Sequence, residues 1–129
     1  MKKRLLVGFI MGVLVLGLAA CGSQPTSPSS NGEVTIALET DPNPPTMGDV
    51  ELIVQVTDAQ GNPLEGARVD VGADHTDMTG MGMHGPASEQ GDGRYAIKAN
   101  FSMTGNWKIT VYVRQGDLDV KQDISIVVR

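Results

Sequence analysis

Apolar and polar residues alternate with a period of two along most of residues 33–129. Alternation of this kind is typical of antiparallel strands that bury one face and expose the other. The apolar positions are Val34, Ile36 and Leu38; Val50, Leu52, Val54 and Val56; Val69 and Val71; Tyr95, Ile97 and Ala99; Trp107, Ile109, Val111 and Val113; Leu118 and Val120; and Ile124, Ile126 and Val128.

Turn-forming sequences separate these runs: D-P-N-P-P at 41–45, Q-G-N-P at 60–63, G-D-G at 91–93 and Q-G-D at 115–117. No stretch of ten residues combines a helical apolar pattern with freedom from Gly and Pro. About seven short strands in one small domain predict an all-β fold, an immunoglobulin-like antiparallel β-sandwich. Trp107, at an apolar position of the longest run, is predicted to fill the core.

The beginning of the chain has the pattern of an export signal. Lys2, Lys3 and Arg4 precede an apolar run over residues 5–20, which is short for a membrane span of ~20 residues. L-A-A-C follows at 18–21 and resembles the lipobox of bacterial lipoproteins. We therefore expect a signal peptide at 1–20, a lipidated Cys21 with a flexible polar tether over 21–32, and one domain over 33–129. The protein would be extracytoplasmic and lipid-anchored to a cell-envelope membrane. The alternative is an uncleaved anchor with an incidental cysteine.

Charge and cysteine content exclude several classes of function. Three of the ten basic residues lie in the signal and all 15 acidic ones follow Cys21, so the mature chain has 7 basic residues and a net charge of −8. Such a chain is unsuited to phosphate backbones, which excludes nucleic acid as a partner. Cys21 is the only cysteine, so no disulfide, thiolate nucleophile or zinc–thiolate cluster is available. No serine lies in a nucleophile elbow, and we predict no enzymatic activity.

The candidate chemistry lies in one segment, H-T-D-M-T-G-M-G-M-H at 75–84. The segment holds both histidines and three of the five methionines that follow the signal. Thioether sulfur and imidazole nitrogen are ligands that copper(I) prefers, and the interspersed glycines favour a loop on which ligands can converge. The predicted metal ligands are His75, Met78, Met81, Met83 and His84, with Met103 as a further candidate.

Other interpretations of this segment remain open. The methionines could fill gaps at the edge of the core or form a contact patch, and Met103 could simply belong to the core. Asp74 and Asp77 lack calcium-loop spacing and are expected to keep the loop solvated. The sequence thus predicts a monomeric domain that stores copper(I) or delivers it to a membrane-associated acceptor protein. The alternative function is a metal-free structural or protein-interaction module on the cell envelope.

A family resemblance is carried by five segments in order. They are D-A-Q-G-N-P-L-E-G-A at 58–67, V-D-V at 69–71, the Met/His segment, G-D-G-R-Y at 91–95 and F-S-M-T-G-N-W-K-I-T-V-Y-V at 101–113. Together they resemble the YtkA-like domain family, which is related to FixH-type proteins. Met103, Gly105 and Trp107 form its most specific motif, M-x-G-x-W. The resemblance implies a small exported β-sandwich and an association with copper handling and oxidase assembly. Many relatives carry a Met-Pro pair in this segment, whereas Thr79 follows Met78 here.

Overall fold

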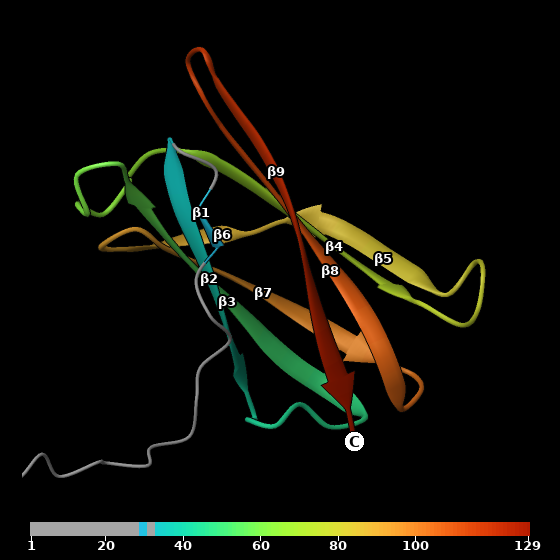
Figure 1. Cartoon of the computed structure of the whole chain (residues 1–129). Helices are drawn as coiled ribbons and strands as arrows, with labels where there is room; N and C mark the ends of the chain where they lie inside the picture. The colour runs from blue at the N-terminus through green and yellow to red at the C-terminus, as the bar shows by residue number, and fades with distance from the viewer. Residues whose placement is uncertain (1–28, 31–32) are drawn as a thin grey trace, which may run out of the picture.

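The computed structural model describes residues 29–30 and 33–129, and every regular element in this part of the chain is a β-strand. Two antiparallel sheets pack face to face (Figure 1). The predicted signal peptide and the predicted lipidation site, Cys21, lie outside the described residues. Among the residues that are described, no helix is present that could cross a membrane.

One sheet has five strands and the other has four. The five-stranded sheet has the order β1 (Ser29–Ser30), β2 (Val34–Asp41), β3 (Gly48–Asp58), β7 (Arg94–Phe101) and β6 (Ser88–Gly91). The four-stranded sheet has the order β5 (Gly82–Pro86), β4 (Arg68–His75), β8 (Gly105–Gln115) and β9 (Leu118–Val128). All neighbouring strands are antiparallel.

The predicted fold class is confirmed, but the described strands number nine instead of about seven. The three strands that the apolar pattern misses, β1, β5 and β6, all lie at sheet edges. These three strands are short, and each is held by the backbone ladder to a single neighbour with little apolar burial, so they leave no alternation in the sequence. The fourth edge strand, β9, is longer and buries one face, so its alternation is visible. Ser29 and Ser30 pair with Ile36 and Thr35, so the end of the predicted tether joins the sheet.

The core consists of the inward-facing positions that the alternation predicts. Trp107 is only 3% exposed, which confirms its place in the core, and its ring meets the Phe101 ring edge-to-face at 4.9 Å. The largest fully buried side chains are Tyr95, Phe101, Ile36, Leu52, Ile109, Val50, Val54, Val56, Val69, Val111, Val113 and Val128. Because these residues come from both sheets, the sandwich has one continuous core.

The strands run between two ends of the sandwich, which we name after their aromatic residues. At the Tyr95 end lie the β3–β4 connection (59–67) and the turns at 92–93 and 116–117. At the Trp107 end lie the β4–β5 turn (76–81) and the β7–β8 connection (102–104). The β4–β5 hairpin, yellow-green to yellow at the right of Figure 1, carries the Met/His segment. The candidate chemistry therefore belongs to the Trp107 end.

Candidate metal centre

The Met/His segment is a β-hairpin, which corrects the prediction of a loop. His75 is the last residue of β4, residues 76–81 form the turn, and β5 begins at Gly82. Gly80 has a φ of +82°, a left-handed conformation that suits glycine in the turn. Glycines weaken a central strand, but β5 is an edge strand paired only with β4, and there they leave space for the side chains of its neighbour.

The hairpin divides the predicted ligands between its two faces. Met83 pairs with Ala73, and His84 pairs with Gly72. Successive side chains of a strand point to opposite faces, so Met83 faces the core side with Ala73 and His84 faces the outer side. Because of this register, the six predicted ligands do not line one pocket. The expectation that both histidines converge with all the methionines is corrected accordingly.

His75 is held inside the structure by hydrogen bonds at both ring nitrogens. The Asp77 backbone N–H donates to Nδ1 at 3.2 Å, so Nε2 carries the proton and donates to the Thr104 carbonyl oxygen at 3.1 Å. The residue is 8% exposed, and its ring meets the Trp107 ring edge-to-face at 5.1 Å. A Cβ on Gly105, whose φ is +120°, would lie 3.0 Å from Nε2. His75 thus joins the hairpin to the β7–β8 connection, and neither nitrogen is free to bind a metal in this arrangement.

Two methionines meet Trp107 in a small cavity on the core side of the hairpin. We call this cavity of about 170 Å³ the thioether pocket; its lining is Gly80, Met81, Gly82, Met83, Asn100, Ser102 and Trp107. The pocket brings residues of β5 together with residues near the end of β7 and the start of β8. The sequence singled out Met81 and Met83 but not Asn100 or Ser102, which enter the site only through the packing of the two sheets.

The remaining two predicted ligands lie outside the thioether pocket. Met78 is in the hairpin turn and is 45% exposed. Met103 packs against the core, and its carbonyl oxygen accepts a hydrogen bond of 3.1 Å from Trp107 Nε1–H. Its backbone therefore has a structural role in holding the β7–β8 connection.

A second, larger cavity lies on the outer face of the same hairpin. We call it the outer pocket; it measures about 360 Å³ and is lined by Gly72, Asp74, Gly80, Gly82, Met83, His84, Thr110 and Tyr112. The His84 and Tyr112 rings meet edge-to-face at 5.8 Å across it. Within the described residues, no group of three or more His, Cys, Asp or Glu side chains could hold a metal ion. A metal site built only from these four residue types would therefore have fewer than three protein ligands.

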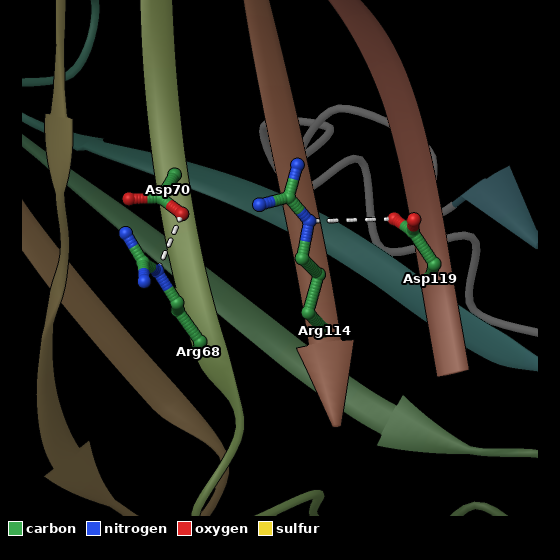
Figure 2. A network of polar contacts seen from close by, with 4 residues as sticks. All are labelled: Arg68, Asp70, Arg114 and Asp119. Carbon is green, nitrogen blue, oxygen red and sulfur yellow. Dashed lines mark hydrogen bonds and ion pairs between the residues drawn. The ribbon is translucent and has the colours of Figure 1, made fainter. Parts of the chain in front are cut away.

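Further along the outer face, the charged side chains neutralise one another. Arg68 Nε lies 3.1 Å from Asp70 Oδ2 on β4, and Arg114 Nε lies 3.5 Å from Asp119 Oδ1 across β8 and β9. Figure 2 shows both pairs as dashed contacts. Arg114 also lies 5.9 Å from the centre of the Tyr112 ring. Asp70 and Asp119 thus each have a guanidinium partner on this face.

The comparisons with known proteins give a family and a fold. The model of the YtkA-like family matches residues 29–112, and no curated protein matches the chain. A crystal structure of FetP from uropathogenic Escherichia coli, produced in the periplasm, is similar at a TM-score of 0.54 and 15% identity, covering 80% of this chain and 93% of that one. A copper-bound variant of FetP has a TM-score of 0.47 and 18% identity, covering 81% and 89%. At this identity the first likeness is one of fold.

Proposed function

The chain belongs to the YtkA-like family, and on that premise we propose that it binds copper(I) in the thioether pocket on the extracytoplasmic side of a membrane. The observation that carries the proposal is that Met81 and Met83 line one cavity together with Trp107. Met81 is the last residue of the hairpin turn and Met83 is the second residue of β5, so the two thioethers reach the pocket from nearby positions. Of the two cavities on the hairpin, the thioether pocket is lined by two methionines, whereas the outer pocket is lined by one, Met83, together with His84.

The chemistry of the lining suits a monovalent soft cation. Thioethers are neutral and polarisable ligands that favour copper(I) over harder ions. Trp107 lines the same pocket, and indole rings attract cations through their π-electrons. The pocket lining contains no carboxylate, so a divalent cation would gain little there. The arrangement thus supports copper(I) with Met81 and Met83 as ligands.

The position of the site supports storage or transfer more than permanent retention. The thioether pocket lies beside the hairpin turn, where Met78 is 45% exposed and provides a sulfur at the surface. Ligand exchange through neutral thioethers needs no proton release, so an acceptor can take the ion stepwise. We propose a membrane-associated copper acceptor, such as an oxidase, as the recipient.

Removal of the two sulfurs at constant volume tests this proposal. The double substitution Met81→Leu with Met83→Leu should weaken copper(I) binding more than tenfold, or ~1.4 kcal/mol, while leaving the fold intact. The measurement is a competition titration against a copper(I) chelator without oxygen. The matched control is Met47→Leu, because Met47 is 60% exposed and lies outside the hairpin.

The alternative function gives the opposite result. If the methionines serve as an apolar contact patch of a structural or interaction module, Leu substitutes for Met without loss. Copper(I) affinity that is unchanged in the double variant, or that falls equally in Met47→Leu, would contradict the proposal.

The lipid anchor is a separate part of the proposal. Cys21 follows a basic start and an apolar run, and several acyl chains on its sulfur would hold the protein firmly on a membrane. Cys21→Ala should move the protein from the membrane fraction to the soluble fraction, or leave it unprocessed. Recovery of the wild-type protein with Met1 intact and without lipid would contradict the anchor.

A further inference from the structure

We infer that the outer pocket is a second metal site, independent of the thioether pocket, that binds a divalent cation such as copper(II) through His84 and Asp74. Both residues line this cavity of about 360 Å³. The hairpin then presents soft ligands on one face and harder ligands on the other. The two sites are separated by the backbone of β5 and share only Gly80, Gly82 and Met83 in their linings.

His84 is the histidine whose nitrogens are available. His75 uses both ring nitrogens in hydrogen bonds, whereas His84 makes no side-chain hydrogen bond to any described residue. Its ring is exposed, and its contact with the Tyr112 ring at 5.8 Å is edge-to-face. That contact orients the imidazole over the sheet without occupying a nitrogen.

Asp74 is the carboxylate on this face that the protein leaves without a partner. Asp70 is paired with Arg68, Asp119 with Arg114, and Asp123 accepts a hydrogen bond of 2.8 Å from the Thr110 hydroxyl. Lys108 faces Asp74 across β4 and β8, yet the two form no ion pair in the described structure. The Asp74 carboxylate therefore remains available to a cation.

Two glycines allow these side chains to lie over the neighbouring strand. Gly72 is opposite His84, and a Cβ there would lie 3.4 Å from His84 Cδ2. Gly82 is opposite Asp74, and a Cβ there would collide with Asp74 Oδ1. Each side chain thus occupies the space above the glycine of the other strand, in a diagonal pair whose Cα atoms lie ~7–8 Å apart. A metal ion between the two side chains is within reach of both.

The donor set selects the class of ion. Imidazole nitrogen with carboxylate oxygen suits borderline divalent ions, and copper(II) is bound most strongly among them. Two protein ligands leave the remaining coordination positions to water, so we expect a weaker and faster-exchanging site than one with three histidines.

The test is a titration of the purified full protein in detergent with copper(II), followed by electron paramagnetic resonance. His84→Ala and Asp74→Asn should each weaken copper(II) binding more than tenfold, and His84→Ala should also remove one nitrogen from the superhyperfine pattern. Asp77→Asn is the matched control, because Asp77 lies in the same hairpin but does not line the outer pocket. It should leave copper(II) binding unchanged.

A crossed comparison separates this inference from the proposed function. His84→Ala should leave copper(I) binding unchanged. Met81→Leu alone, at a residue that lines only the thioether pocket, should weaken copper(I) binding and leave copper(II) binding unchanged. Copper(II) binding that persists in both His84→Ala and Asp74→Asn would overturn the second site. If His84→Ala or Met81→Leu weakened the binding of both copper(I) and copper(II), the two sites would not be independent. Failure of copper(I) binding alone would contradict only the thioether pocket.

Discussion

At both ends of the sandwich, buried aromatic side chains form hydrogen bonds with a connecting segment, but the two ends differ in the side chains that surround these contacts. At the Tyr95 end, the Tyr95 hydroxyl donates to the Leu64 carbonyl at 2.8 Å and accepts from the Ala67 N–H at 3.1 Å. At the Trp107 end, Trp107 Nε1–H donates to the Met103 carbonyl and His75 Nε2–H to the Thr104 carbonyl. In each case a buried aromatic ring fixes the backbone of a connecting segment.

The difference lies in the surroundings of those aromatic residues. The Tyr95 end is closed further by polar contacts between loops: Gly66 N–H donates to the Glu89 carboxylate, and the Gln115 side chain donates to the Glu65 carbonyl. The Trp107 end instead contains the thioether pocket, with Met81 and Met83 beside Trp107. Similar anchoring therefore stabilises both ends, and only one of them keeps soft side chains around a cavity. We therefore expect the aromatic anchors to stabilise the fold and, on our proposal, the methionines to bind the ion.

Trp107→Ala should have the largest effect on stability. The side chain is buried against Phe101 and His75 and donates a hydrogen bond, so its removal leaves a cavity and should lower the free energy of unfolding by ~3–5 kcal/mol. Urea unfolding followed by circular dichroism measures this loss. The control is Tyr112→Ala on the same strand, whose half-buried ring lies on the outer face and should matter far less. A Trp107→Ala protein that stays stable but no longer binds copper would show that Trp107 serves the binding site and does not stabilise the core.

His75→Ala should have the next largest effect on stability. Its comparison with His84→Ala distinguishes the roles of the two histidines of the hairpin. His75→Ala leaves the Asp77 N–H and the Thr104 carbonyl without their partners and should cost ~1–3 kcal/mol. His84→Ala, at an exposed position, should change stability by no more than ~0.5 kcal/mol. Thermal unfolding of the two variants checks the difference. Equal effects would mean that His75 does not hold the Trp107 end together.

Tyr95→Phe probes the anchor at the other end and should cost about 1 kcal/mol at neutral pH through the lost hydroxyl contacts. Burial is the largest cause that raises the pKa of Tyr95 above 10.0, and the nearby charges of Glu89 and Glu65 act in the same direction. With a raised pKa in the folded state, the stability from this group is complete below pH ~10 and is lost as the pH rises through the folded pKa.

The pH dependence of unfolding tests that assignment. The difference in unfolding free energy between the wild-type protein and Tyr95→Phe should shrink as the pH rises above ~10, because only the wild type loses the contribution. A constant difference up to pH 11 would show that Tyr95 does not ionise with unfolding.

The two regions also differ in how far the sequence predicts them. Around the core, alternation and turn residues identify β2, β3, β4, β7, β8 and β9 and the burial of Trp107, because burial of one face of a strand imposes a period of two. At the hairpin, Gly80 and Gly82 hide the edge strand β5. If residues 82–86 are a loop, Met83 and His84 can converge, whereas in a strand they must face opposite sides. The residue types indicate metal chemistry, but only the register divides them between two pockets.

The position of Asp74 is another feature that the sequence alone does not predict. As part of a loop it is expected only to be solvated, and its place beside His84 follows from pairing with Gly82 and the lack of a side chain there. Long-range contacts determine the lining of the thioether pocket in the same way, because Asn100 comes from the end of β7 and Ser102 from the connection that follows it.

The most direct test of the account observes the methionine methyl groups themselves. The full protein, labelled with ¹³C at the methionine methyls and titrated with copper(I) without oxygen, should show shifts of the Met81 and Met83 resonances at the first equivalent. The Met47 resonance, from an exposed residue outside the hairpin, should stay in place. Shifts at Met47 or Met103 with unchanged Met81 and Met83 resonances, or no shifts at all, would contradict copper(I) binding in the thioether pocket.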